Sequence, residues 1–600
     1  MVKPATQSVQ KSVQPIKMSQ PASQRHSFWI WGWLGLISYL ALFWHLGAVG
    51  LVDETEPIFA ETSRQMWITG DWITPTFNGL ERFDKPPLIY WLQATAYYLL
   101  GLNEWAVRIP SAIAALVQVV FGAATLLRFG GSRGHQENLT QPPWGLSRAW
   151  WAALLGGTLL ATTPLTLVWG RTGVSDMVLV ACVSGAMWAF FWAYAGSGRH
   201  WYLVFYTLLG LGILAKGPVA LVLPGLSLGL FLLWLGRDHA LKVMREMGLI
   251  AGTVVVLVIT LPWYVAVIGR HGWAYVQDFF GYHNVARFTQ VVNNHSAPWY
   301  FYGLVVLVGF LPYSVHLPLV MARLRFWQRQ RWRGIPRDQH LGLFALCWFG
   351  AVFGFFSMAV TKLPSYLLPL MPAAAMLVAL EWSCQLTAVP DLSQSHHRIP
   401  WPDWITGILN AAFLAVLAGL GWQLPRLLGP DDAAPDLTAA IQTFHLPTGS
   451  LVGWGLAFGL AVVLLGLRQV RWLWTANVLG SLGLVVLLFS SAIFALNDAR
   501  QVPLRELALE LRADTSEAQQ DPVLMVGVFK PSLVFYSQRT IIPVPDPGQL
   551  SQVLQDLAAT TEPFTGAWVV GLKQDLVLAQ LSLDEGQDFD PYGLVRIEDP

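Results

Sequence analysis

Residues 28–51 read FWIWGWLGLISYLALFWHLGAVGL and decide the fold class, because this run is too long and too apolar for a water-soluble domain. An α-helix needs about 20 apolar residues to cross the roughly 30 Å of hydrocarbon in a bilayer. No cleavage site of small residues follows the run, so we expect a retained membrane anchor and not a signal peptide. Residues 1–27 are rich in Gln, Ser and Pro and contain no acid, which predicts a disordered tail on the cytoplasmic side.

The composition extends this interpretation to the whole chain. Of its 600 residues 54% are hydrophobic and only 12% are charged, about half the usual charged share. Such a chain cannot cover a water-exposed surface with polar groups, so the predicted class is a polytopic α-helical membrane protein. The net charge of +1 gives no indication of a nucleic-acid partner. Cys182, Cys347 and Cys384 form no CxxC pair and are interpreted as core residues.

Apolar segments of spanning length recur along residues 28–496, which we interpret as a transmembrane domain of about thirteen helices. They lie near residues 28–51, 105–128, 149–169, 174–195, 201–215, 217–235, 247–268, 299–320, 341–360, 363–382, 403–424, 449–467 and 471–495. Residues 87–102 are apolar but short, and they predict an interfacial or re-entrant helix.

The distribution of Lys and Arg predicts the orientation. Basic residues gather in loops 129–148, 236–246 and 321–340, which places these loops in the cytoplasm. By alternation, the first large loop (52–104) and the second large loop (269–298) are then external.

After residue 496 the composition changes to that of a soluble domain. Short apolar runs such as PVLMVGVF (522–529) and TIIPV (540–544) alternate with helical patterns such as VPLRELALELRA (502–513). This alternation predicts a small external α/β domain over residues 497–600. It contains no glycine-rich phosphate loop.

The first external loop carries an unusual concentration of carboxylates. Residues 53–87 read DETEPIFAETSRQMWITGDWITPTFNGLERFDKPP and begin directly after the first span. Asp53, Glu54 and Glu56 repel one another, and an apolar neighbourhood raises the pKa of a carboxyl group. One of the three is therefore positioned to accept a proton from an incoming nucleophile. The following residues predict an amphipathic helix on the membrane surface, with Ala60 and Met66 toward lipid.

Cations and a histidine follow in both large loops. Lys85 lies at headgroup level beside Asp84, where it is positioned to hold a phosphate, although a lysine that only snorkels to the interface is an alternative. In the second loop, His283 and Arg287 share a helix face. Arginine binds phosphate bidentately, and His283 with Asp84 forms a candidate site for a divalent metal ion. A lone histidine also suits a purely structural role.

Short external turns add Arg171, Lys216 and Lys362, the last followed by Tyr366. Each cation alone is explained as a membrane-edge anchor. Together with Lys85 and the second loop they place many positive charges outside, against the usual bias, which predicts a site for a lipid phosphate.

Several motifs occur in order over about residues 28–385. They are AETSRQMWITGDWITP (60–75), RFDKPPLIYWL (82–92), NEWAVRIPSAIAAL (103–116), AKGPVALVLP (215–224), HNVARFT (283–289) and KLPSYLLPLMP (362–372). In these motifs the chain resembles the bacterial aminoarabinose transferase and protein O-mannosyltransferase superfamily of GT-C glycosyltransferases. The resemblance implies a multi-pass enzyme of the bacterial plasma membrane. It would move a sugar from a polyprenyl phosphate to an external acceptor and use no nucleotide sugar.

The resemblance also implies residue roles. Asp53 matches the family's aspartate in the first external loop, which implies that it is the catalytic carboxylate or orients the acceptor. Lys85 matches the lysine that binds the lipid phosphate. Arg287 with Phe288 matches the Arg-Phe pair of the second loop, and Tyr366 matches the tyrosine of the K-L-x-x-Y-x-L-P turn.

The chain departs from the family pattern at three points. Two extra residues separate the first acidic pair from Ala60, so Glu56 competes with Asp53 and its neighbour for the carboxylate role. Phe59 replaces a tyrosine, and Asn284 stands where aminoarabinose members carry a histidine. These departures argue against a metal ion in the site and against aminoarabinose as the sugar.

The mechanism we expect is direct displacement at the anomeric carbon of the sugar. Lys85 and Arg287, with Lys216 or Lys362, stabilise the leaving phosphate, and Asp53 removes the proton of the acceptor hydroxyl. The acceptor is a lipid A-like lipid, a glycan or a protein hydroxyl. The alternatives are a lipid or sugar transporter (flippase) without transfer chemistry, which predicts mid-membrane charges and internal repeats, and a scaffold or receptor without chemistry.

Overall fold

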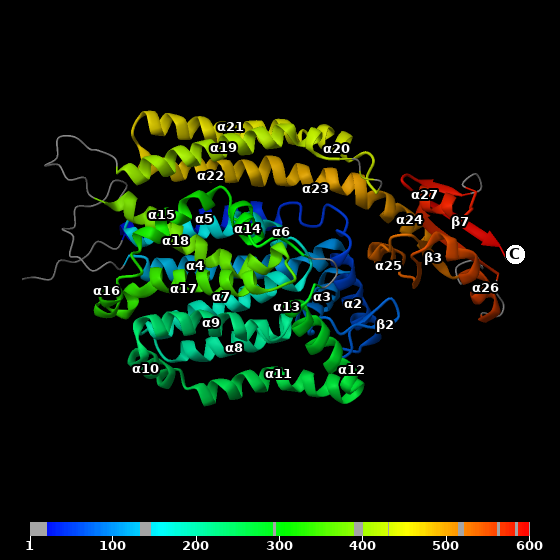
Figure 1. Cartoon of the computed structure of the whole chain (residues 1–600), viewed down its shortest axis with the longest axis horizontal. Coiled ribbons are helices and arrows are strands. Elements are labelled where there is room, and N and C mark those ends of the chain that lie inside the picture. The colour runs from blue at the N-terminus through cyan, green and yellow to red at the C-terminus, as the bar shows by residue number, and fades with distance from the viewer. Residues whose placement is uncertain are drawn as a thin grey trace, which may run out of the picture.

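The computed structural model describes residues 21–131, 146–291, 296–388, 400–429, 431, 433–513, 521–560, 565–582 and 586–598. They form a long helical bundle with a small sheet domain at one end (Figure 1). Residues 1–20 of the predicted tail lie outside the described residues, and the first helix begins at Pro21.

The bundle is built from helices with long apolar sequences. They are α1 (Pro21–Ser38), α4 (Glu104–Phe129), α5 (Arg148–Thr162), α6 (Pro164–Gly170), α7 (Ser175–Tyr194), α8 (His200–Lys216), α9 (Val219–Leu235), α11 (Leu249–His271), α14 (Phe301–Gly309), α15 (Leu317–Arg323), α17 (Leu341–Met358), α18 (Met371–Thr387), α19 (Trp401–Leu427), α21 (Leu446–Gly466), α22 (Leu473–Gly483) and α23 (Ser490–Leu496). Among the described residues, eight helices are long and apolar enough to cross a membrane, or up to ten if each bent pair is one span. The predicted multi-pass class is confirmed, but this number is below the predicted thirteen spans. Each predicted segment nevertheless overlaps at least one helix of the bundle.

Two segments predicted as single straight spans are bent. Helices α5 and α6 meet at 58°, and α14 meets the following helical segment Tyr313–Arg323 at 113°. Pro164 lies at the first break and Pro312 at the second. Proline lacks the N–H group that an uninterrupted helix requires, and its ring clashes with the preceding turn.

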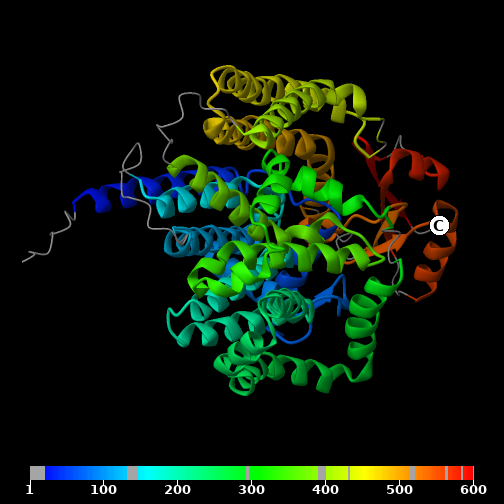
Figure 2. The same cartoon turned by 60° about the vertical axis from the view of Figure 1, so that its left-hand side comes forward.

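The helices form distinct layers. In both views α19, α21 and α22 lie together along one side of the bundle (Figures 1 and 2). Helices α7 and α18 are almost completely surrounded by protein, whereas α11 is largely exposed, as expected of a helix that faces lipid.

The loops between the long helices and the sheet domain lie at the same end of the bundle (Figure 1). The loop elements are α2 (Thr55–Thr69), β1 (Thr76–Phe77), β2 (Leu80–Glu81), α3 (Leu88–Leu100), α12 (Trp273–Val276), η2 (Gln277–Ala286), α13 (Arg287–Thr289), η5 (Pro364–Leu370) and α20 (Leu437–Thr443). The opposite end carries α10 (Arg237–Met247) and α16 (Arg329–Gly334), both rich in basic residues.

Helix α2 is buried, which corrects the prediction that it lies on the membrane surface. Ala60 and Met66, expected to face lipid, are 0% and 1% exposed. Glu61 and Arg64 are also buried and form an ion pair at 2.7 Å. The helix packs between α3 and the sheet domain. Because this packing excludes water, the two buried charges of the ion pair have each other as partners.

The C-terminal domain contains a five-stranded sheet in the order β4 (Ile541–Val544), β3 (Val523–Val526), β5 (Gly566–Leu572), β7 (Tyr592–Glu598) and β6 (Gln587–Phe589). The first three strands are parallel, and β7 and β6 are added antiparallel. Its helices are α24 (Val502–Ala513), α25 (Pro531–Ser537), α26 (Leu550–Thr560) and α27 (Lys573–Leu578).

The predicted boundary at residue 497 lies inside a helix. Helical structure continues from Val470 to Ala513. It passes from α23 through η8 (Asn497–Gln501) into α24. Within α24, Leu504, Leu507 and Leu511 have the spacing of one buried helix face, and this face packs in the domain core.

Candidate functional site

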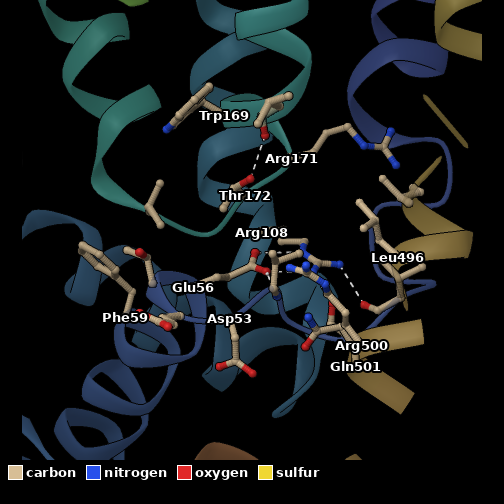
Figure 3. Close-up of a pocket in the computed structure, with 18 of the residues that line it drawn as sticks. Asp53, Glu56, Phe59, Arg108, Trp169, Arg171, Thr172, Leu496, Arg500 and Gln501 are labelled. Atoms are coloured by element: carbon tan, nitrogen blue, oxygen red, sulfur yellow. Dashed lines mark hydrogen bonds and ion pairs between the residues drawn. The ribbon is translucent and has the colours of Figure 1, made fainter. Parts of the chain in front are cut away.

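A cavity of about 940 Å³ lies where the bundle, the two large loops and the sheet domain meet. The acids of the first loop and several cations line it, namely Asp53, Glu54, Glu56, Lys85, Arg108, Arg171, Lys216, Arg287, Arg500 and Lys530. Figure 3 shows Asp53 and the Glu56–Arg108 pair on one part of its wall, with Arg500 and Gln501 contributed by the last long helix. The structure therefore brings the predicted acids and most of the predicted cations into one shared space.

Lys85 is held in this wall by the turn that precedes α3. Its Nζ atom donates to the Asp84 carbonyl at 2.8 Å and lies 3.5 Å from the Asp84 carboxylate. Burial would raise the pKa of Asp84, but the positive charges of Arg82 and Lys85 lower it to about 2. Burial, together with nearby cations that include Arg287 and Lys216, lowers the pKa of Lys85 to about 8.

Arg287 and Lys216 complete a cation cluster around Lys85. The Nε atom of Arg287 is buried and has no hydrogen-bond partner in the described part of the chain. Lys216 pairs with Asp176 at 2.7 Å and still lines the cavity. A buried donor such as the Nε–H group of Arg287 costs free energy unless an acceptor reaches it. An anion in the cavity would provide that acceptor.

A second cavity of about 460 Å³ shares the cation cluster but is otherwise mostly apolar. Lys85, Lys216, Arg287 and Tyr366 line both cavities. The remaining wall contains many hydrophobic side chains, among them Val219, Val222, Phe279, Phe280, Phe288, Phe355 and Phe356. A cationic pocket that continues into an apolar one matches the two ends of an anionic lipid.

Glu56 is completely buried and fully paired. Its two carboxylate oxygens accept from Nε and Nη2 of Arg108 at 2.9 and 2.8 Å. They also accept from the backbone N–H groups of Gly173 at 2.7 Å and Val52 at 2.8 Å. The remaining Arg108 donors bind three backbone carbonyls of residues 46–50. The pair therefore fixes the chain that leads to Asp53.

Asp53 and Glu54 differ from Glu56 in their surroundings. Asp53 accepts hydrogen bonds from the backbone N–H and the hydroxyl group of Ser532 in the sheet domain. Burial raises the pKa of Asp53, although these hydrogen bonds and the positive charge of Lys530 act in the opposite direction. Glu54 is exposed and lines the same cavity.

Two predicted phosphate ligands lie away from the cation cluster. Arg171 lines the large cavity, but its guanidinium donates to the Ala41 carbonyl at 3.2 Å and lies over the Phe489 ring. Burial and the charge of Arg108 lower its pKa to about 10. Lys362 lines neither cavity, because its ammonium donates to the carbonyls of Ser357 and Ala359 at the end of α17. Cations are stabilised at helix C-termini, so this position suits Lys362 to a structural role, and its contact with the phosphate stays a prediction.

The predicted metal site at Asp84 and His283 does not fit a divalent ion. Among the residues that the structure describes, no three His, Cys, Asp or Glu side chains group closely enough to hold a metal. Asp84 is already paired with Arg82 and Lys85, at 2.6 and 3.5 Å. The positive charges of Arg82, Lys85 and Arg287, which act on both Asp84 and His283, would repel a metal ion.

Several residues in or behind the cavity wall were not predicted from the sequence. Arg108 lies at the start of an apolar segment, and an arginine in such a place signals a buried partner. Ser532, Lys530 and Tyr592 belong to the soluble domain and carry no local signal that connects them to the first loop.

The fold and the site define a class: a multi-pass membrane protein with a cation-lined cavity that adjoins a mostly apolar one. A family model described as dolichyl-phosphate-mannose-protein mannosyltransferase matches residues 84–132 and 146–265. Undecaprenyl phosphate-alpha-4-amino-4-deoxy-L-arabinose arabinosyl transferase of Pseudomonas savastanoi is 30% identical over 457 residues, which cover 75% of each chain. The chain therefore belongs to the aminoarabinose transferase and protein mannosyltransferase superfamily of GT-C glycosyltransferases.

Other relatives are matched over less of their length. The corresponding protein of Erwinia tasmaniensis is 30% identical over 54% of this chain and 53% of its own, so the match spans about half of that relative. Among solved structures, ArnT from Cupriavidus metallidurans bound to undecaprenyl phosphate has a TM-score of 0.73 at 23% identity. The comparison covers 95% of this chain and 98% of that one, and it shows that the two share a fold.

Proposed function

We propose that this protein transfers a sugar from a polyprenyl-phosphate donor to a hydroxyl group of a lipid, glycan or protein acceptor. The observation that carries the proposal is the junction of the two cavities. There Lys85, Lys216 and Arg287 surround the point where the acid-lined space meets the apolar one. The cations would bind the phosphate, the apolar cavity would hold the start of the polyprenyl chain, and the sugar would extend toward Asp53.

The reaction we propose is a single displacement. Asp53 takes the proton of the acceptor hydroxyl as the hydroxyl oxygen attacks the anomeric carbon. The bond between that carbon and the phosphate oxygen breaks, and its electron pair stays on the phosphate. Lys85 and Arg287 stabilise this developing charge. Attack from the face opposite the phosphate inverts the anomeric configuration. Glu56 has no free lone pair directed into the cavity and acts as a positioning residue.

We further propose that the cavity opens on the external side of a bacterial plasma membrane. The basic helices α10 and α16 lie at the opposite end of the bundle, which the positive-inside bias assigns to the cytoplasm. The C-terminal domain is then external.

The assay that tests the function uses the purified protein, a polyprenyl-phosphate donor with a labelled sugar, and an acceptor lipid extract. A transferase releases polyprenyl phosphate and moves the label to the acceptor. A transporter leaves the donor intact, and recovery of intact donor from every acceptor class would contradict the proposal.

Lys85→Ala should weaken binding of undecaprenyl phosphate about 30-fold or more. Removing one partner of a buried, hydrogen-bonded charge pair costs about 2 kcal/mol or more, and 1.4 kcal/mol is about tenfold in affinity. Binding to the purified protein in detergent measures the effect. Lys242→Ala, an exposed lysine on α10, is the control and should bind normally. Equal affinities of the two variants would remove Lys85 from the site.

Donor affinity should fall as the pH rises through about 8. Lys85, with its pKa lowered to about 8, is protonated below this pH and binds the phosphate. A bound phosphate raises the pKa of Lys85, so the affinity is full below pH 8 and declines by up to about tenfold per pH unit above it. A phosphodiester donor is the right probe, because its phosphate does not titrate in this range. Lys85→Arg should flatten the profile, since arginine stays charged.

A further inference from the structure

The sheet domain and the first external loop share one hydrophobic core. Leu51 and Tyr97 on the membrane side pack in the same buried cluster as Leu507, Leu533 and Leu594 of the domain. Buried apolar contact of this kind is the dominant stabilising contribution in a folded protein. The sheet domain is therefore packed firmly against the part of the cavity wall that contains the acids of the first loop.

Hydrogen bonds fix the register between the two parts. The Tyr536 hydroxyl accepts from the Leu51 N–H at 2.9 Å and donates to Glu104 at 3.0 Å. The Asn78 side chain exchanges two hydrogen bonds with the backbone of Ile541, both at 2.8 Å. These contacts lie on both sides of Asp53 along the loop, so they hold the loop on the domain surface.

At the centre of this contact, Ser532 binds the carboxylate of Asp53. The backbone N–H of Ser532 donates to Oδ1 at 2.9 Å, and its hydroxyl donates to Oδ2. The Ser532 side chain is 1% exposed, so water does not compete with the hydroxyl. The two residues are 479 positions apart, and their meeting depends entirely on the docking of the domain.

We propose that Ser532 is a positioning residue of the active site, through which the C-terminal domain orients the Asp53 carboxylate and keeps it ionised. The inference rests on the proposed function, because it gives Asp53 the role of the base. A hydroxyl hydrogen bond to a carboxylate is stronger when the carboxylate is ionised. The hydroxyl of Ser532 therefore favours the form of Asp53 that accepts a proton.

Other groups that face Asp53 act on the same equilibrium. Burial raises the pKa of Asp53, as does the neighbouring Glu54, whereas Lys530 lowers it. Burial raises the pKa of Tyr592 on β7, and so does the negative charge of Asp53. The Tyr592 hydroxyl therefore stays neutral over the pH range of the assay. Arg500 and Asp431, which act on Tyr592, pair with each other. None of these groups changes when Ser532 is substituted. A shift in the pKa of Asp53 would therefore result from the loss of the Ser532 hydroxyl.

The test is the pH profile of sugar transfer by the full-length Ser532→Ala protein. The acid limb should move upward by about one pH unit, since a hydrogen bond to a charged group is worth about that much in pKa. At acidic pH the rate should then fall about tenfold, while the rate on the alkaline side of the limb should stay within about twofold. Loss of a merely structural contact would lower the rate by one factor at every pH.

Two further variants sharpen the test. Ser537→Ala removes another buried hydroxyl of α25, one that donates to the Leu533 carbonyl and not to Asp53, and should leave the profile in place. Ser532→Thr restores the hydroxyl and should restore the acid limb. If Ser532→Ala does not fold, Ser532→Cys, with its weaker donor, should give a smaller shift in the same direction.

The outcomes separate the inference from the function on which it rests. An unchanged acid limb in Ser532→Ala or Ser532→Cys, with a wild type that transfers sugar, overturns the inference alone. A wild type that transfers no sugar overturns the proposed function and the inference with it.

Discussion

Asp53→Asn lowers the rate of sugar transfer by about 10²- to 10⁴-fold, the range that general base catalysis contributes. The amide has the size of the carboxylate and keeps an oxygen that can accept from Ser532, but it cannot take a proton from the acceptor. Binding of undecaprenyl phosphate should stay close to that of the wild type, because the cation cluster is untouched. Steady-state kinetics with a labelled donor, together with direct binding, measure both quantities.

Glu54→Gln is the matched comparison for this result. Glu54 lines the same cavity and is the nearest alternative base, but it is exposed and makes no contact with the sheet domain that resembles the Asp53–Ser532 pair. A base whose pKa is raised toward the working pH is the more effective one, and burial raises the pKa of Asp53. We expect Glu54→Gln to retain transfer within about tenfold. The reverse pattern would assign the base to Glu54.

The cation cluster was accessible from the sequence because its members lie between predicted spans. Lys216 separates two spans, whereas Lys85 and Arg287 lie in the first and second large loops. Alternating crossings return such positions to one side of the membrane, so topology alone brings them to one end of the bundle. The same argument does not reveal that the Lys362 ammonium turns back onto the carbonyls of Ser357 and Ala359 at the end of α17.

The roles of the three acids depend on contacts that no local pattern encodes. Glu56 binds Arg108, 52 residues away, and the backbone of Gly173, 117 residues away. Asp53 binds Ser532 in a different domain. The bend after α14 is a further case: Pro312 is visible in the sequence and predicts a break, but it does not predict the angle of 113°.

The largest expected effect of substituting Glu56 is on the stability of the folded protein. Its pair with Arg108 has side chains only 0% and 3% exposed, so neither charge has access to water. Arg108 also donates hydrogen bonds to the backbone carbonyls of Leu46, Val49 and Gly50. Removing one charge of a buried pair leaves the other without compensation, and this costs about 3–5 kcal/mol.

Glu56→Gln should therefore lower the free energy of unfolding by about 3–5 kcal/mol, with activity per folded molecule also reduced because the Asp53 loop loses its support. Denaturant unfolding in detergent measures the loss. Asp71→Asn is the control, because Asp71 pairs with Arg270 at 2.8 Å while both side chains are substantially exposed. Exposed pairs contribute about 0–1 kcal/mol, so this variant should unfold almost as the wild type does. Equal losses in the two variants would mean that the Glu56 charge is not buried against Arg108, and the support we assign to the Asp53 loop would have to come from elsewhere.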